Sequence, residues 1–213
     1  MKEHPILFST PMIQAILLGT KSQTRRVIKV KDVYKGISHF EHTTDNYWIS
    51  RLIVDMRGLY PDSKPTTILG NLYKCPYGEV GDRLWVRETW VDMVCVASTE
   101  KGKGKGESNP HYKASSDSTE LKILQGHWKP SIFMPRKYSR ITLEITDIRV
   151  QRLQEISEQD AYAEGCPSVI ATIAEVPMVN WYKHLWDGIN AKSGYGWDKN
   201  PFVWCISFKV IKE

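Results

Sequence analysis

The sequence of 213 residues has few cysteines and no pair of them with metal-binding spacing. Cys75, Cys95, Cys166 and Cys205 are scattered and form no C-x-x-C motif. Zinc ribbons depend on such motifs, and small secreted proteins depend on a dense disulfide framework, so the pattern indicates neither class. The histidines also lack ligand spacing beyond the weak string HFEH, and we therefore predict no metal and no cofactor.

Long hydrophobic runs are also absent. No apolar stretch approaches the ~20 residues that a membrane-spanning helix requires. The opening string MKEHPILFSTPM has no long apolar core after its charges, unlike a secretory signal. We expect a cytoplasmic protein with reduced cysteines and no membrane partner.

The overall composition is that of an ordinary globular protein, with 41% hydrophobic and 25% charged residues. A formal net charge of +5 favours anionic partners, and eight Trp and ten Tyr offer flat faces on which a base could stack. This combination points weakly to nucleic acid or a nucleotide. The alternative is that the charge aids solubility and the aromatic residues fill the core.

Local signals predict short helices between short strands. Ser9 or Thr10 can cap a helix that Gly19 ends, and Ser157 can cap a second helix that Gly165 ends. A strand is expected from Thr24, and the strings RITLEITDIRVQRL and FVWCISFKVI have the alternation of longer strands. A further amphipathic helix is expected in PMVNWYKHLWDGIN. The pattern favours an α+β domain whose mostly antiparallel sheet curls toward a small barrel.

The stretch LLGTKSQTRRVIKV, residues 17–30, combines a predicted helix end with a cluster of cations. Alternation along a strand places Thr24 and Arg26 on one face and Arg25 on the other, while Lys21 lies in the preceding turn, close to the Thr24 face. A threonine nucleophile needs an adjacent base, and a lysine can serve if burial and nearby cations lower its pKa. Equally, these cations could form a solvated edge after the helix.

The string GTKSQTRR resembles the G-x-K-x-x-x-x-R signature of the ASCH superfamily, whose domains have a PUA-like β-barrel fold associated with RNA binding. Most members have an acidic residue where this chain has Thr24. The bacterial N4-acetylcytidine amidohydrolases instead have G-x-K-x-x-T-x-R, as here. The strings KSQTRR and GDRLWVRETW also resemble longer ASCH-type proteins of bacteriophages and prophages.

The resemblance implies a catalytic set of Lys21, Thr24 and a distant glutamate. In the amidohydrolases this glutamate lies in a helix that follows a strand, and the register of SEQDAYAEG places Glu164 at that position. Thr24 would then attack an N-acyl amide, Lys21 would accept the proton of Thr24, and Glu164 would deliver a proton to the leaving nitrogen. Without the resemblance, Glu164 reads as an ordinary helix residue.

Two further segments are candidates for substrate binding. In WVRETW, alternation separates Trp85 and Arg87 from Glu88, and either face could contact a base or line the core. The string WKPSIFMPRKYSR carries Arg136 among other cations and aromatic residues, which is typical of a nucleic-acid rim. We predict that Arg26, Trp85, Arg87, Glu88 and Arg136 bind substrate.

The domain organisation expected is a single ASCH, PUA-like domain over residues 1–213, with insertions at about 31–74, 92–128 and 168–200. The first insertion is expected to hold one short helix or strand around Ser50–Met56. The Gly-rich string between Lys101 and Gly106 is expected to be a mobile loop tip.

Three functions remain open at this stage. The first is hydrolysis of an N-acyl amide on a modified cytosine, in a nucleoside, a nucleotide or RNA. The second is a regulatory module that binds RNA in the same basic cleft without breaking a bond. The third is an RNA-cleaving enzyme, although no histidine pair is evident to act as its acid and base. The sequence does not determine the oligomeric state.

Overall fold

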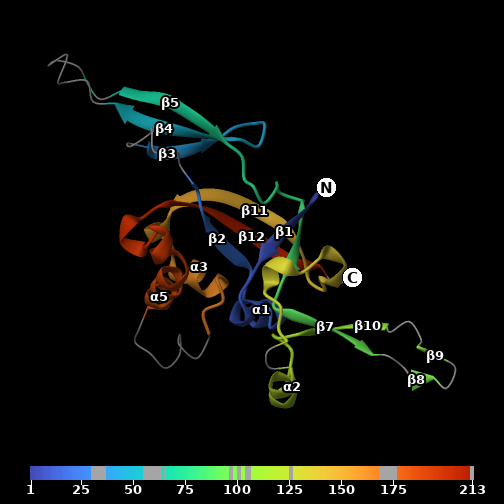
Figure 1. Cartoon of the computed structure of the whole chain (residues 1–213). Coiled ribbons are helices and arrows are strands. Elements are labelled where there is room, and N and C mark those ends of the chain that lie inside the picture. Colours follow the sequence, from blue (N-terminus) through green and yellow to red (C-terminus); the bar gives the residue numbers. More distant parts are fainter. Residues whose placement is uncertain are drawn as a thin grey trace.

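The protein is described from a computed structural model of the whole chain, and the described residues are 1–29, 37–54, 64, 66–95, 98–99, 102–103, 107–124, 127–167 and 177–211. Figure 1 shows the arrangement of their helices and strands. The strands are β1 (Glu3–Leu7), β2 (Gln23–Val27), β3 (Ile37–His42), β4 (Trp48–Val54), β5 (Thr66–Tyr73), β6 (Arg83–Arg87), β7 (Trp90–Cys95), β8 (Ser98–Thr99), β9 (Gly102–Lys103), β10 (Glu107–Tyr112), β11 (Thr142–Arg152) and β12 (Phe202–Ile211). The helices are α1 (Thr10–Leu17), α2 (Ser118–Ile123), α3 (Glu158–Ala163) and α5 (Met178–Asn190).

The main sheet has five strands in the order β1-β6-β11-β12-β2. β1 and β6 pair in parallel, and the other neighbours pair antiparallel. In the described part of the chain β1 and β2 are both edge strands, so the sheet is open. The mixed α+β class is therefore confirmed, whereas the expected closure into a barrel is not found. Closure would require hydrogen bonds between β1 and β2, and instead the Arg26 side chain of β2 donates to the carbonyl oxygen of Leu7 in β1.

The expected helix after residue 9 is confirmed as α1, with Ser9 at its N-cap and Pro11 in its first turn. Gly19 follows the helix with φ +77°, a left-handed conformation that glycine adopts without strain. The chain then enters β2 at Gln23, one residue before the predicted start. The Ser9 side chain makes no capping hydrogen bond, whereas α3 is capped by the Ser157 hydroxyl, which accepts a hydrogen bond from the Asp160 backbone N–H.

Residues 37–54 and 66–73 form more regular structure than the single short element expected around Ser50–Met56, of which residues 55 and 56 lie outside the described part of the chain. β3, β4 and β5 make a three-stranded antiparallel sheet. This sheet packs on the main sheet through aromatic contacts, with the rings of Phe40 and Phe202 4.9 Å apart and those of Trp48 and Trp204 6.0 Å apart. The sequence predicted too few strands here, because cross-strand pairing cannot be recognised in a sequence without clean alternation.

Two hydrophobic clusters hold the elements together. The larger lies under the main sheet and includes Ile6, Leu84, Leu143 and Ile206, each at most 1% exposed. The smaller joins α3 and α5 to β12 and contains Tyr182 and Trp186. Of the segment expected as a loop tip, only Gly102 and Lys103 are among the described residues, where they pair with β8. No described helix is long and apolar enough to cross a membrane.

Candidate active site

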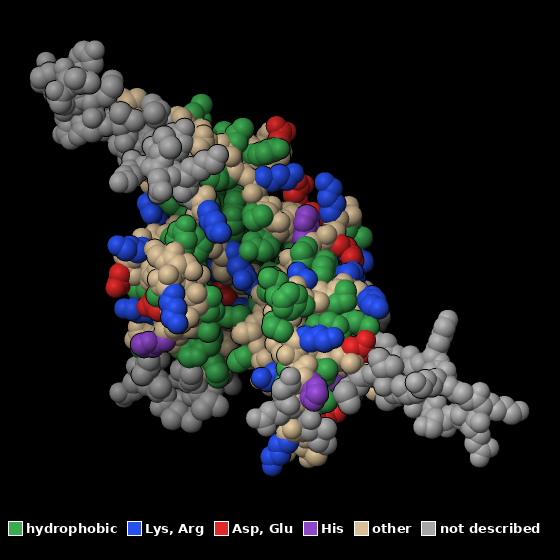
Figure 2. Space-filling view, viewed as in Figure 1, with side chains coloured by type: hydrophobic (Ala, Val, Ile, Leu, Met, Phe, Trp, Pro, Cys, Tyr) green, Lys and Arg blue, Asp and Glu red, His purple; other side chains and the backbone are tan. Residues whose placement is uncertain are grey.

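A cavity of about 510 Å³ lies between the two edge strands of the open sheet. Its wall includes Leu7 from β1, Thr24 and Arg26 from β2, and Tyr182 and Trp186 from α5. Figure 2 shows a hollow in this region of the surface, between the parts that cover α5 and α1, with charged side chains at its floor. The volume falls in the range of about 300–1,000 Å³ that is usual for small-molecule sites. The site therefore lies between the edges of β1 and β2, which hydrogen bonds would join in a closed barrel.

The buried ion pair between Lys21 and Glu164 lies against this cavity. The Lys21 Nζ is 2.7 Å from Glu164 Oε2, and the two side chains are 0% and 2% exposed. The ammonium also donates to the backbone oxygens of Gln23, at 2.7 Å, and Glu164, at 2.8 Å. Glu164 lines the cavity, while Lys21 lies behind it. All three ammonium hydrogens thus have an oxygen acceptor.

The backbone explains how two residues so far apart in sequence meet. Lys21 and Glu164 form an isolated antiparallel bridge, and the Ser22 N–H donates to the Ala163 oxygen at 2.9 Å. Gly165, with φ +96°, turns the chain directly after Glu164, and a Cβ there would be 3.0 Å from the Ala15 Cβ. The close approach of α1 and the end of α3 therefore sets the position of the pair.

The electrostatics of Lys21 reflect this environment. Burial lowers the pKa of the Lys21 amine, and the Glu164 carboxylate acts in the opposite direction but does not fully offset it. Burial also raises the pKa of the Tyr182 hydroxyl well above its ordinary value, and the Glu164 charge adds to this shift. The site thus disfavours charge that is not matched by a close partner.

Thr24 is 3% exposed and lines the same cavity as Glu164. Among the described residues, its hydroxyl has no hydrogen-bond partner. The structure therefore brings Lys21, Thr24 and Glu164 to one place, although Lys21 makes its hydrogen bonds to Glu164 and Gln23 rather than to Thr24. The alternative that Lys21, Arg25 and Arg26 form a solvated edge after the helix is wrong for the first two, whose side chains are buried.

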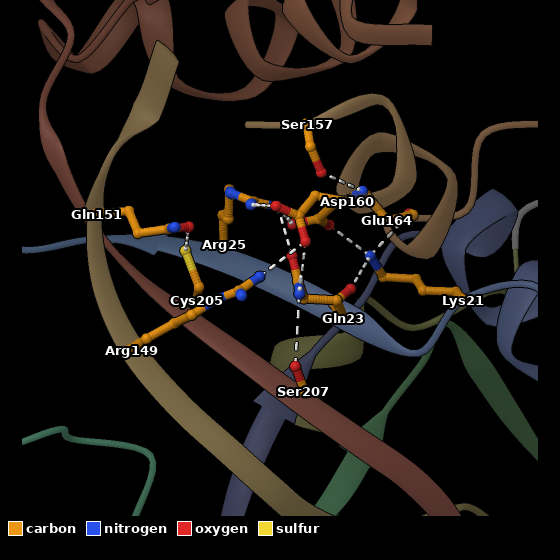
Figure 3. Close-up of polar contacts among 10 residues, drawn as sticks. All are labelled: Lys21, Gln23, Arg25, Arg149, Gln151, Ser157, Asp160, Glu164, Cys205 and Ser207. Atoms are coloured by element: carbon orange, nitrogen blue, oxygen red, sulfur yellow. Dashed lines mark hydrogen bonds and ion pairs between the residues drawn. The ribbon is translucent and has the colours of Figure 1, made fainter. Parts of the chain in front are cut away.

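A network of charges behind the pair involves residues that the sequence interpretation missed. The Arg25 side chain is 0% exposed, and its Nη2 donates to Asp160 Oδ2 at 2.9 Å. Asp160 also accepts from Arg149 at 2.7 Å and from the Gln23 side chain at 3.2 Å. Figure 3 shows these side chains converging from β2, β11 and α3. The spacing of Asp160 and Glu164, one helical turn apart, was the available signal that both share a face of α3.

Arg25 connects this network to the candidate catalytic carboxylate. Its Nη1 donates to Gln23 Oε1 at 2.5 Å and lies 3.6 Å from Glu164 Oε1. That Oε1 atom is buried and has no hydrogen-bond partner among the described residues. One oxygen of Glu164 is thus fixed by Lys21, and the other is left to a weaker contact at the cavity wall.

The other predicted binding residues are used elsewhere in the fold. Arg87 donates to the backbone oxygens of Met134 and Ile132, and its guanidinium lies 5.2 Å from the Trp85 ring centre. Glu88 is buried and accepts two hydrogen bonds from Arg140. Arg136 forms a two-point ion pair with Glu3. None of Trp85, Arg87, Glu88 and Arg136 lines the cavity, whereas Arg26 does, so binding roles for those four stay a prediction without support from the cavity.

Aromatic side chains complete the wall of the cavity. Phe8, Tyr77, Tyr182 and Trp186 all line it. Tyr182 and Trp186 are spaced by four residues on α5, and from sequence this spacing reads as the buried face of an amphipathic helix. Among the described residues, no group of three or more His, Cys, Asp or Glu side chains is placed to hold a metal ion.

Comparison with known proteins adds little to these observations. No protein-family model and no curated protein matches the sequence. Among solved structures, the chain is similar to an ASCH domain from Lactobacillus crispatus, known from a high-resolution crystal structure. The similarity has a TM-score of 0.38 and 11% identity, and covers 98% of this chain and 79% of that one. At this TM-score the likeness carries no weight for fold or function.

Proposed function

We propose that this protein is an ASCH-type, PUA-like hydrolase that cleaves an N-acyl amide on a modified cytosine. The G-x-K-x-x-T-x-R motif supports the family, and its likeness to phage proteins is part of the same proposal. The observation that carries the function is the geometry at the cavity. Thr24 and Glu164 line one cavity, and the Lys21 Nζ lies 2.7 Å from Glu164 Oε2.

The buried pair can supply both the base and the acid of this reaction. Transfer of one proton across the 2.7 Å hydrogen bond converts the ammonium and carboxylate into a neutral amine and a neutral acid. Burial favours the neutral pair, because the proton transfer removes two charges that are poorly solvated at this buried position. The neutral Lys21 amine can then accept the proton of Thr24, while protonated Glu164 can donate to a leaving nitrogen.

The bonds change in two stages. The Thr24 oxygen adds to the acyl carbon, the carbon–nitrogen bond breaks, and the nitrogen leaves as the amine of cytosine with a proton from Glu164. Water then attacks the acyl-threonine ester, which releases a carboxylic acid and restores the Thr24 hydroxyl. The guanidinium of Arg25 or Arg26 can stabilise the negative oxygen that forms in each stage.

The shape of the cavity favours a single nucleoside or nucleotide over a long polymer. Its wall carries four aromatic side chains suited to stacking against a base, and α5 closes one side. An extended basic groove would instead favour RNA. In the predicted rim, the charge of Arg136 is paired with Glu3.

Incubation of the purified protein with N4-acetylcytidine, followed by mass detection of cytidine, tests the proposal. We expect release of cytidine and acetate by the wild type, and a loss of at least about 100-fold in kcat for Thr24→Ala. Thr89→Ala is the matched control, because Thr89 lines the same cavity without a proposed chemical role. Wild-type turnover no faster than that of Thr24→Ala would contradict the enzymatic function.

A non-catalytic binding module is the second candidate, and one observation favours it. The Lys21 ammonium has three oxygen acceptors within 2.8 Å, an arrangement that stabilises its charged form and so opposes its action as a base. In this alternative the cavity binds the modified base or RNA, and Lys21 only holds Glu164 in place. Binding of N4-acetylcytidine without release of cytidine would support it. RNA cleavage by paired histidines has no such support, since none of the described residues that line the cavity is a histidine.

A further inference from the structure

The charges that line the cavity are unbalanced. Arg25, Arg26 and Lys29 contribute positive charge to its wall, and Glu164 contributes the one negative charge among the described lining residues. Directly behind the wall, Lys21 pairs with Glu164, and Arg25 pairs with Asp160. Both carboxylates are therefore paired, and among the described residues the charges of Arg26 and Lys29 have no matched anion.

Arg26 is held firmly but keeps most of its hydrogen-bond donors free. Its Nη2 donates to the Leu7 oxygen at 2.7 Å, and no carboxylate in the described part of the chain forms an ion pair with it. Its guanidinium carbon lies 5.3 Å from the centre of the Phe8 ring and 6.0 Å from that of Tyr77. The hydrogen bond to Leu7 and the two aromatic contacts hold the guanidinium at the cavity wall, where its remaining Nη hydrogens can bind an oxyanion.

Two buried donors at this wall also lack partners. The Nε atoms of Arg25 and Arg26 are both buried, and neither forms a hydrogen bond with the described residues. Arg25 is only 4% exposed, so water does not readily compensate for its unpaired donor. Three further arginines, Arg51, Arg83 and Arg149, also have a buried Nε atom without such a bond, so these atoms do not by themselves distinguish the cavity wall.

Arg26 and Lys29, the two cations without an ion pair among the described residues, follow Thr24 in the sequence, whereas Lys21 precedes it. Arg26 follows Thr24 by two residues on the same strand, so their Cα atoms are about 6.6 Å apart. Lys29 is exposed and lines the cavity just beyond the end of β2. A ligand whose amide lies at Thr24 and Glu164 would therefore direct its other end toward Arg26 and Lys29.

From these contacts we infer that the cavity has an anion subsite, formed by Arg26 and Lys29, that binds a phosphate group of the ligand. The inference rests on the proposed function for the identity of the base, and it deepens that function by naming a nucleotide, rather than a neutral nucleoside, as the substrate. The phosphate can be the monoester of a single nucleotide or a diester within RNA, since both present the same oxygens.

Binding measurements by calorimetry test the subsite separately from catalysis. The ligands are inorganic phosphate, cytidine, cytidine monophosphate and a short RNA that contains cytidine. We expect cytidine monophosphate to bind at least about tenfold more tightly than cytidine, and we expect this ratio to fall as salt screens the exposed Lys29. Tighter binding of the RNA than of the monophosphate would identify the diester as the natural source.

Variants assign the effect to the named residues. In Lys29→Met and Arg26→Gln, the ratio of monophosphate to cytidine affinity should fall toward one. Lys29→Met is the safer variant for folding, because Lys29 is exposed and makes no hydrogen bond or ion pair with the described residues. Lys122→Met removes an equally exposed lysine on α2, outside the cavity lining, and should leave the ratio unchanged.

The two proposals fail in different ways. Equal affinity for cytidine and its monophosphate, together with no binding of inorganic phosphate, would overturn the anion subsite. The same result follows if Lys29→Met and Arg26→Gln retain the full preference for the monophosphate. Absence of cytidine release from N4-acetylcytidine, together with absence of cytidine monophosphate release from its monophosphate, would instead overturn the hydrolase and leave the measured phosphate preference standing.

Discussion

Lys21 and Glu164 are the residues on which both the fold and the proposed chemistry depend. Each is at most 2% exposed, and each is the main counter-charge of the other. Removing one partner of a buried pair leaves an uncompensated charge, which costs about 3–5 kcal/mol. Such a pair is therefore much more sensitive to substitution than a surface ion pair.

We expect Lys21→Met to lower the free energy of unfolding by about 3–5 kcal/mol, as measured by urea denaturation. Lys209→Met is the control, since Lys209 pairs with Glu144 at 2.9 Å but is 62% exposed. That substitution should cost about 0–1 kcal/mol. Equal losses in the two variants would contradict the buried pair. Addition of Glu164→Leu to Lys21→Met should recover part of the stability, because it removes the stranded charge.

Asp160 is expected to make the free energy of unfolding depend on pH. Burial acts to raise the pKa of its carboxyl, but the nearby guanidinium groups of Arg25 and Arg149 outweigh burial and hold the pKa below its ordinary value of 3.8. A carboxylate with a lowered pKa contributes stability that is present above its unfolded-state value. That contribution is lost as the pH falls through the folded-state value.

The expected result is a free energy of unfolding that decreases as the pH falls below about 4, with a weaker decrease in Asp160→Asn. Urea denaturation at a series of pH values from about 5 to about 2 measures both slopes. Asp198→Asn provides the comparison, since the Asp198 side chain is 92% exposed and should not change the slope. An unchanged slope in Asp160→Asn would show that this carboxyl does not contribute.

At the scale of elements, the site depends on how closely α1, α3 and β2 approach one another. Gly165 ends α3 in a left-handed conformation, where an added Cβ would be 3.0 Å from the Ala15 Cβ and 3.3 Å from the Lys21 Cβ. Either neighbour would have to move, and Lys21 cannot move without disturbing its hydrogen bonds to Glu164. Glycine is required here both for its φ angle and for space.

Gly165→Ala should therefore destabilise the protein by about 1–3 kcal/mol. Gly188→Ala is a matched control within α5, where an added Cβ meets nothing within 4 Å. Alanine has the higher helix propensity, so this variant should gain up to about 1 kcal/mol. Thermal unfolding monitored by circular dichroism compares the two variants, and a loss of stability in both would contradict the steric explanation.

The element scale also shows where sequence patterns were sufficient. Ser9 and Gly19 bound α1, and Ser157 and Gly165 bound α3, because caps and left-handed glycines act over only a few residues. The sequences of β11 and β12 were equally recognisable as strands, although β12 is buried along most of its length and β11 is fully buried only near its start. Local chemistry determines these elements, so their bounds could be predicted.

At the scale of the whole molecule, the sheet of β3, β4 and β5 is joined to the core. Phe40, Trp48 and Tyr73 pack against the main hydrophobic cluster, and Arg152 of β11 donates to the Ile37 oxygen. That the segment 31–74 is an insertion into a smaller domain stays a prediction. The contacts of β3, β4 and β5 nevertheless make this sheet part of the packed structure rather than a peripheral addition.

This packing predicts that substitutions in this sheet lower the free energy of unfolding by different amounts, depending on whether the side chain contacts the core. Trp48→Ala should lower the free energy of unfolding by about 3 kcal/mol, the lower end for a buried aromatic residue, because Trp48 is only half-buried. Leu69→Ala on β5, where Leu69 is 62% exposed, should change it by about 0.5 kcal/mol or less. Urea denaturation measures both variants. Equal losses of unfolding free energy in the two variants would contradict the packing of this sheet against the main hydrophobic cluster.

The open gap between the edges of β1 and β2 is the feature of the whole molecule on which the proposed function depends most. A closed barrel would have joined these edges by backbone hydrogen bonds and filled the space that the cavity occupies. Instead, side chains from both edges line that space, and Arg26 bridges them through the Leu7 oxygen. Closure of the expected barrel would thus remove the cavity, because both require the same space between β1 and β2.

The sequence by itself determined the short elements, their caps and the motif that contains Lys21 and Thr24, because each depends on neighbours a few residues away. Only the tertiary structure decided that Lys21 is buried, that Arg25 and Asp160 brace Glu164, and that the sheet stays open. These features join residues up to 143 positions apart. Their geometry depends on how helices and strands pack, which no local pattern specifies.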